Sequence, residues 1–293
     1  MLSLNPEDIS TGQLHGYLLG AVSPRPICFA STVDSKGNVN LAPYSFFNVF
    51  SAKPPIMIFS PARRVRDNTT KHTLENILET KEVVINIVSY AMVQQMSLAS
   101  TEYAKNVNEF TKAGFTEVAS EKIKAPRVAE APIQFECKVN EVIALGSEGG
   151  AGNLIIAEVV KLHINESILD SERKIDPLKI DTVARMGGNW YSRAKEGLFE
   201  VPKPLATLGI GVDALPTEVQ NSKVLTGNNL GLLANVEQFP SEEYVNGFIS
   251  SASETIQYVV ASGSIEERHL SAQQLISDNN IEGAWSVLLA KGI

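Results

Sequence analysis

Cysteine is scarce in this chain of 293 residues. Only Cys28 and Cys137 occur, far apart and each within an apolar run. We therefore expect no disulfide framework. We expect instead that both cysteines are buried free thiols in a reducing cytoplasm. The four histidines show no HxxxH spacing and the cysteines no CxxC spacing, so the sequence predicts no metal site.

Long apolar runs and an excess of basic charge are also missing. No stretch approaches the ~18 uninterrupted apolar residues of a membrane span. The opening MLSLNPEDIS has acidic residues where a secretory signal has Lys or Arg. With 25 basic and 33 acidic residues the net charge is −8, which disfavours nucleic-acid binding. We expect a cytoplasmic, soluble protein with neither membrane nor nucleic acid as a partner.

Common catalytic motifs are absent as well. The sequence has no GxSxG, P-loop or HExxH motif. Residues 209–214 match the GxGxxA dinucleotide pattern, but Pro204 lies too close before it for a long strand. Leu215-Pro216 would interrupt the helix that should follow. We therefore do not expect a Rossmann fold.

The first 200 residues read mainly as short strands separated by turns. The strands expected are residues 24–33, 39–41, 56–60, 83–88, 133–145 and 153–165. Pro43 is expected to interrupt the second of these strands. Residues 40–48 are too irregular for a simple strand. Turns at 34–38 and 147–152 predict two hairpins. Helices are expected at 71–80, 91–99 and 107–112. This order favours a mainly β fold, a closed or partly closed antiparallel barrel with helical insertions.

After Pro202 and Pro204 the pattern changes to apolar residues at helical spacing. Ser264-x-x-Glu267 and Ser271-x-x-Gln274 match the capping box at a helix start. We expect a barrel domain over 1–204 and a mostly α-helical C-terminal extension over 205–293. Its apolar faces should pack on the barrel or on a partner subunit.

One segment concentrates positive charge in a net acidic chain. Arg63, Arg64, Arg66 and Lys71 fall within nine residues. Thr69, Thr70 and Thr73 lie among them at the expected start of a helix. Cations, hydroxyls and free backbone N–H groups at a helix start suit a phosphate oxygen. The alternative is a solvated basic loop.

A second segment, residues 40–48 (NLAPYSFFN), mixes small, aromatic, amide and hydroxyl side chains. A planar heterocycle needs apolar contact on its faces and polar partners along its edge. The alternative is a core loop whose polar groups are satisfied internally.

Together the two segments resemble the flavin reductase-like family, including its flavoredoxin-like branch, whose members share the FMN-binding split barrel. The similarity covers residues 20–193. The specific block is PRPICFASTVDSKGNVNLAPYSFFNVFSAKPPIMIFSP. It is followed by KHTLENI, VVINIV, APIQFECKV, NLIIAEVVKLHIN and DPLKIDTVARMGGNWY.

The resemblance implies non-covalent FMN at a homodimer interface, held by a six-stranded antiparallel split β-barrel. It implies that Ser31 and Thr32 face the pyrimidine side or ribityl chain. The isoalloxazine edge would be lined by Asn40, Ala42, Pro43, Tyr44 and Ser45, with Asn48 nearby. The phosphate would be held by Ser60, Lys71, Thr73 and Asn76, while Arg185 approaches from the later part of the barrel. His72 stands where many members have Asp, which leaves its role open.

The sequence is compatible with three functions. The favoured hypothesis is an NAD(P)H-dependent flavin reductase in which the cofactor does the chemistry and no side chain is catalytic. Its partner would be a monooxygenase or an electron-transfer protein. The alternatives are a flavoredoxin-like FMN electron carrier without nicotinamide activity, and a non-redox ligand-binding or assembly module. Whether FMN is retained or released as a substrate stays open, as does a role of the helical extension in assembly or as a lid.

Overall fold

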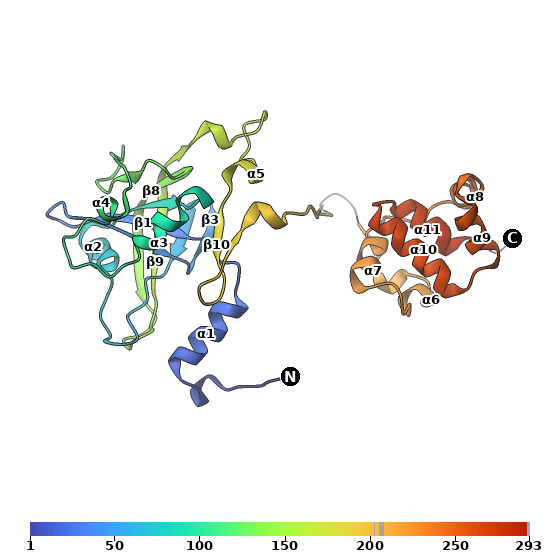
Figure 1. Ribbon diagram of the computed structural model, residues 1–293, viewed down its shortest axis with the longest axis horizontal. Coiled ribbons are helices and arrows are strands. Elements are labelled where there is room, and N and C mark those ends of the chain that lie inside the picture. Colours follow the sequence, from blue (N-terminus) through green and yellow to red (C-terminus); the bar gives the residue numbers. More distant parts are fainter. Residues whose placement is uncertain (202, 205–207, 292–293) are drawn as a thin grey trace. The chain divides into compact units, whose positions relative to one another are not determined.

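The chain divides into two compact units, Met1–Phe199 and Glu200–Ile293 (Figure 1). The computed structural model describes residues 1–201, 203–204 and 208–291. Pro202 and residues 205–207, which include the expected start of the helical extension, lie outside the described residues. So do residues 292–293 at its end.

The first unit is built on one seven-stranded antiparallel sheet with the order β2-β1-β5-β8-β9-β4-β3. Its strands are β1 (Cys28–Val33), β2 (Val39–Tyr44), β3 (Phe47–Ala52), β4 (Pro55–Phe59), β5 (Glu82–Ile87), β8 (Ile133–Ala144) and β9 (Asn153–Ile164). The resemblance implied six strands, so the sheet has one more than expected.

The sheet curls into a partly closed barrel. Strands β2 and β3 are its two opposite edges, yet only Ser45 and Phe46 separate them along the chain. An extended chain advances at most about 3.3–3.6 Å per residue, so this connection requires the two edges to lie close together. The barrel is therefore split between β2 and β3, as an antiparallel split barrel is.

The barrel interior is apolar and is closed by helix α2 (His72–Thr80). Leu74 and Ile77 of α2 pack among residues from β1, β4, β5, β8 and β9, including Phe59 and Ile85. Both cysteines are free and buried in this cluster, as predicted. Residues of α2 that follow the cationic segment are thereby fixed against the strands.

The remaining helices of the first unit are α1 (Thr11–Ala21), α3 (Val93–Leu98), α4 (Glu109–Ala113) and α5 (Pro177–Ile180). Two small hairpins are formed by β6 (Glu117–Val118) with β7 (Arg127–Val128) and by β10 (Val183–Arg185) with β11 (Tyr191–Arg193). Short 3₁₀ turns lie at Pro6–Asp8, Tyr90–Met92, Glu166–Ile168 and Ala194–Gly197. Helices α3 and α4 pack on the outer face of β1 and β2 through Phe29, Leu41, Met96 and Phe110.

Most expected elements are confirmed, and both hairpins form where their turns predicted them. The expectation that Pro43 interrupts its strand is wrong, because β2 continues to Tyr44 and Pro43 pairs with Phe29. Strand β2 is an edge, and the N–H of Leu41 points away from β1 to Glu109. Pro43, two residues further on, has the same orientation, so its missing N–H removes no ladder bond. Strand β3 and helix α1 were not predicted.

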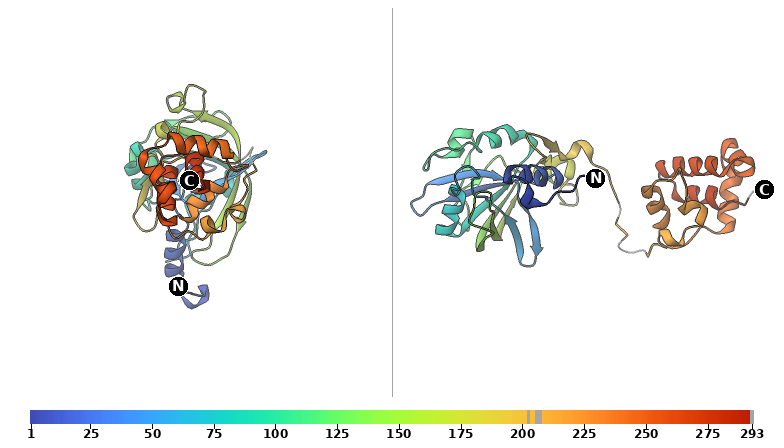
Figure 2. Two further views of the ribbon diagram at one scale, coloured as in Figure 1. Left: turned by 90° about the vertical axis from the view of Figure 1, so that its right-hand side faces the viewer. Right: turned by 90° about the horizontal axis from the view of Figure 1, so that it is seen from below.

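The second unit is helical in its described residues, as expected (Figure 2). Its helices are α6 (Thr217–Gln220), α7 (Gly227–Ala234), α8 (Glu242–Ser251), α9 (Glu254–Ser262), α10 (Ile265–Ser277) and α11 (Ile281–Leu289), with a 3₁₀ turn at Val212–Ala214. The capping box at Ser264 and Glu267 is confirmed, but Ser271 lies inside α10 and caps no helix. No helix in the described parts of the chain is long and apolar enough to cross a membrane.

The apolar faces of these helices pack on one another and form cores within the second unit. Trp285 of α11 is fully buried at the centre, with its Nε1 donating to the carbonyl oxygen of Leu233 at 3.1 Å. Phe239 stacks on its edge, with ring centroids 4.9 Å apart. Residues 209–214 form an irregular segment and the 3₁₀ turn, so no strand–helix dinucleotide site exists there.

Candidate functional site

The bend between β2 and β3 forms one wall of a cleft in the first unit. Ser45 and Phe46 turn the chain at the split of the barrel. The carbonyl oxygen of Phe46 accepts a hydrogen bond from the N–H of Ser60 at 2.9 Å, which ties the bend to the end of β4. The bend therefore stands directly beside the beginning of the cationic segment.

The turn of the β8–β9 hairpin holds the cationic segment from the other side. The N–H of Arg63 donates to the carbonyl oxygen of Ala151 at 2.8 Å. A Cβ at Gly149 would lie 3.0 Å from the carbonyl oxygen of Arg64, so a glycine permits this close backbone approach. The Arg63 guanidinium turns away to Asn68 and leaves Arg64 as the first cation of the cluster.

Three cations converge on one carboxylate, that of Glu102 in the α3–α4 connection. The Nε of Arg64 lies 2.9 Å from its Oε1 and the Nζ of Lys71 lies 3.7 Å from it, while Arg66 binds the other oxygen. The hydrogen bond from Arg64, aided by Arg66, lowers the pKa of Glu102, so the carboxylate is charged at neutral pH. The basic segment is therefore an anion-binding cluster, and the anion it holds is the protein's own.

A chain of hydrogen bonds links the end of β2, next to the bend, to helix α2. The Oη of Tyr44 donates to Oγ1 of Thr73 at 2.8 Å, and Thr73 donates to Oδ1 of Asn40 at 2.6 Å. The Nδ2 of Asn40 donates to Oε1 of Glu109 at 2.9 Å. Burial raises the pKa of both Tyr44 and Glu109. The two predicted segments are thus joined side by side.

The cleft has a volume of about 460 Å³, within the range of small-molecule sites. Its lining includes seven of the predicted site residues: Ala42, Pro43, Tyr44, Ser45, Ser60, Lys71 and Arg185. A narrow recess beside it is lined by Asn40, Thr73, Arg64, His72 and Glu102, together with Lys71 and Tyr44. The cationic cluster therefore opens into the cleft through Lys71.

Arg185 marks the other end of the cleft. Its guanidinium lies 4.7 Å from the ring centroid of Tyr191 and donates to the carbonyl oxygen of Gly188 at 2.8 Å. An adjoining hollow of about 420 Å³ shares Pro43, Tyr44, Ser45, Ser100 and Arg185 with the cleft. The two adjoining hollows together have Lys71 and Arg185 in their lining.

The sequence of this region matches a known family. A model described as the flavin reductase like domain matches residues 20–179, all within the first unit. The chain belongs to the flavin reductase-like family. An uncharacterized protein of Aquifex aeolicus is 38% identical over 181 residues, covering 62% of this chain and 90% of the relative.

Solved structures of similar proteins agree with the split barrel. Nitrilotriacetate monooxygenase component B from Bacillus cereus is 31% identical with a TM-score of 0.63, covering 69% of this chain and 98% of that protein. A putative flavin reductase with split barrel domain from Shewanella frigidimarina is 26% identical with a TM-score of 0.59, covering 69% and 100%. The antiparallel barrel of this flavin reductase-like chain is thus the fold of its family.

Six predicted site residues of the flavin reductase-like unit do not line the cleft: Asn40 and Thr73 line only the recess beside it, and Ser31, Thr32, Asn48 and Asn76 line neither. Ser31, Thr32 and Asn76 are buried, and Nδ2 of Asn76 donates to Oγ1 of Thr32 at 3.1 Å between α2 and β1. Asn48 is exposed on β3 and its Oδ1 accepts from the N–H of Val49. The structure thus brings together the bend, Ser60, Lys71 and Arg185, but sets the last four apart.

Helix α1 supplies a wall of the cleft that the sequence analysis missed. Its His15 and Leu19 line the cleft, and His15 meets the ring of Phe46 edge-on, with centroids 6.2 Å apart. A capping box at Ser10 and Gln13 begins the helix and was a readable signal. None of its residues is buried, so the helix lacks the buried apolar face by which a sequence predicts an amphipathic helix.

Arg25 fixes the end of that helix and was also missed. Its guanidinium binds the carbonyl oxygens of Leu19 and Val22 at the end of α1, and that of Met186 at 2.9 Å. Its Nε lies 3.4 Å from Oγ of Ser45 in the bend. Arg25 is buried, and burial followed by the charge of Arg185 lowers its pKa. One side chain therefore positions both walls of the cleft.

Residues of the cleft fit the FMN that the family implies. The carboxylate of Glu102 among Arg64 and Lys71 is a stand-in for a phosphate oxygen at the same donors. The buried hydroxyl of Ser60 has no hydrogen-bond partner among the residues that the structure describes. A Cβ at Gly152 would lie 2.6 Å from that hydroxyl, so only glycine leaves it room. Hydrogen-bond donors suited to an anion thus lie beside an aromatic, partly apolar wall.

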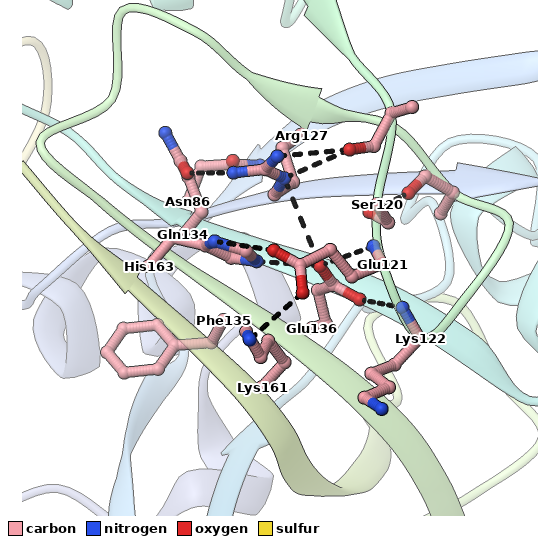
Figure 3. A network of polar contacts seen from close by, with 12 residues as sticks. Asn86, Ser120, Glu121, Lys122, Arg127, Gln134, Phe135, Glu136, Lys161 and His163 are labelled. Atoms are coloured by element: carbon pink, nitrogen blue, oxygen red, sulfur yellow. Dashed lines mark hydrogen bonds and ion pairs between the residues drawn. The ribbon is translucent and has the colours of Figure 1, made fainter.

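A second polar network lies away from the cleft, around the buried carboxylate of Glu136 on β8 (Figure 3). It accepts hydrogen bonds from the N–H groups of Glu121 and Lys122 at 2.9 and 2.6 Å, and its Oε1 lies 2.7 Å from Nε2 of His163. None of these residues lines the cleft. The network fastens the 119–125 loop to the sheet. Within the described residues no three metal-binding side chains gather.

Proposed function

We propose that this chain is an FMN-dependent oxidoreductase that accepts hydride from NAD(P)H. When bound, FMN supplies the chemistry, because its N5 accepts the hydride and later releases electrons to a second acceptor. The protein then has three tasks: to bind the phosphate, to orient the ring and to keep one ring face open. Consistent with this division, no catalytic side chain is assigned.

The observation that carries the proposal is the junction of two segments at one cleft. Arg64 and Lys71 form an anion site, and the Tyr44–Thr73 hydrogen bond joins it to the bend. The bend and Arg185 border about 460 Å³ of space. A phosphate at the cations would leave the ring system to lie along the bend toward Arg185.

The names of similar proteins support the partner class. One is component B of a monooxygenase and another a putative flavin reductase. We propose that this chain likewise delivers reducing equivalents to a separate oxygenase or electron-transfer protein. Homodimerisation is part of the proposal, and sedimentation of the purified chain tests it. A cytoplasmic location also stays a prediction, consistent with two free, buried thiols.

A spectrum of the purified protein tests the function. The full chain is purified, mixed anaerobically with FMN and desalted, and its flavin absorbance is followed after NADH or NADPH is added. Bleaching of the flavin band by either nicotinamide supports the proposal. Bleaching by dithionite alone indicates an electron carrier without nicotinamide activity. A protein that binds no FMN contradicts both, and a non-redox module is then the better description.

A further inference from the structure

Glu102 occupies the anion cluster from within the protein. Its connection runs from the end of α3 to α4, and the carboxylate reaches Arg64 across 38 residues of sequence. It meets all three converging cations, Arg64, Arg66 and Lys71. No second anion from the described residues lies within ion-pair distance of Arg64 or Lys71. The cluster is thus neutralised in part before any ligand arrives.

The carboxylate and an incoming phosphate would compete for the same donors. Lys71 lines both the cleft and the recess that contains Glu102, so it is the member of the cation cluster that a ligand in the cleft meets. A carboxylate a few ångströms from a phosphate repels it, and attracts the cations that the phosphate needs. Binding of a phosphate ester is therefore opposed while Glu102 holds its position.

Little holds Glu102 there apart from these ion pairs. The side chains of Glu102 and Arg66 are 37% and 69% exposed, whereas that of Arg64 is 16% exposed. Ion pairs of exposed side chains contribute little to stability, because water screens them and long side chains lose rotamer freedom. The pair with Arg66 therefore contributes little, and Arg64 is the main partner of Glu102; a phosphate that takes over the hydrogen bond from Arg64 would leave the carboxylate to turn to solvent.

We propose that Glu102 is a built-in competitor of the flavin phosphate that makes FMN exchangeable. The proposal rests on the proposed function, since it presumes that FMN binds in the cleft. It assigns to Glu102 a positioning role on the cations, with no contact to the reacting atoms. In this view the flavin behaves as a substrate that is released after reduction, and the connection from Ser100 to Lys105 sets its residence time.

The test compares FMN with riboflavin, which lacks the phosphate. Dissociation constants are measured by flavin fluorescence for the wild-type chain and for Glu102→Gln, which keeps the size of the side chain and removes its charge. The control is Glu172→Gln, because Glu172 is exposed, forms an ion pair with Lys174 and gives the same change in net charge. We expect Glu102→Gln to bind FMN about tenfold more tightly and to release it more slowly. Riboflavin binding should change less than twofold, and the control should match the wild type.

Other outcomes overturn the proposal. Unchanged or weaker FMN binding by Glu102→Gln would show that the carboxylate does not compete. An equal gain for FMN and riboflavin would place the effect outside the phosphate site. If the wild-type chain binds FMN, either result contradicts this inference alone. If it binds neither flavin, the proposed function fails and the inference falls with it.

Discussion

The hydroxyl of Tyr44 lies 2.8 Å from Oγ1 of Thr73, which joins the last residue of β2 to the first turn of α2. The same threonine donates to Asn40. Both hydroxyls are therefore used inside the protein, and Thr73 is fully buried. The contact aligns the two segments that border the cleft, beside Lys71.

Replacement of Tyr44 by Phe should loosen this alignment. The variant removes the donor to Thr73, at a cost of about 1 kcal/mol in the free energy of unfolding of the first unit. We expect a matching, modest loss of FMN affinity. Urea unfolding followed by circular dichroism and flavin titration measure the two effects. Tyr17→Phe is the control, because Tyr17 is 53% exposed on α1; equal behaviour of the two variants would contradict the alignment.

Lys71→Ala should weaken FMN binding while leaving riboflavin binding nearly unchanged. Loss of one charge-assisted contact to a phosphate corresponds to about 10–100-fold in the dissociation constant. Flavin fluorescence titration gives both constants. Lys36→Ala, in the exposed β1–β2 loop, serves as a control for the loss of one positive charge. A similar loss for both flavins would mean that Lys71 does not contact the phosphate.

Glu136 should make the first unit sensitive to acid. Burial by itself raises the pKa of this carboxyl, but the hydrogen bonds from Glu121, His163 and Lys122 together lower it below its ordinary value. A lowered pKa stabilises the fold above the unfolded-state pKa of about 4.3, and this part is lost as the pH falls through the folded-state pKa. Glu136→Gln should lose about 2 kcal/mol at pH 7 and show a weaker decline below pH 4.5. Urea unfolding of both proteins at pH 7 and below pH 4.5 measures the free energy of unfolding. Parallel pH profiles of the wild type and the variant would contradict the prediction.

Arg25→Lys should release the end of α1. A lysine cannot reach the carbonyl oxygens of Leu19, Val22 and Met186 together, because it lacks the planar fork of the guanidinium. Amide hydrogen exchange over α1 should accelerate about tenfold, while β8 and β9 keep their protection. Arg173→Lys, on an exposed turn with one ion pair, is the matched control. Unaltered exchange in α1 would mean that other contacts hold the helix.

Trp285→Ala should unfold the second unit and spare flavin binding. A buried tryptophan replaced by alanine costs about 3–5 kcal/mol, and the unit has its own core. Trp190 is the other tryptophan and is 77% exposed in the first unit. Far-ultraviolet circular dichroism should lose helical signal while FMN affinity stays within twofold. Loss of FMN binding would show that the units depend on each other.

Much of the fold was readable from local patterns. The partial alternation along residues 133–145, with a glycine-rich turn before residues 153–165, predicted the β8–β9 hairpin, because period-two burial and turn chemistry are local. Pro43 misled the strand prediction, since only the sheet order reveals that β2 is an edge with its N–H groups turned outward. Helix α1 has no buried residue and so gave no periodic signal.

By itself the sequence determined the cations, the bend and a helical C-terminal region, because these depend on residue type and short spacing. The split-barrel family followed from the resemblance of longer sequence blocks to known proteins. The tertiary structure decided which cations bind the carboxylate of Glu102 and that Thr73 and Asn76 are buried. It also decided that Arg25 connects the end of α1 with Ser45 and that Glu102 closes the cluster. Such contacts join residues far apart in the chain, and their partners are selected by strand register and loop closure, which no local pattern encodes.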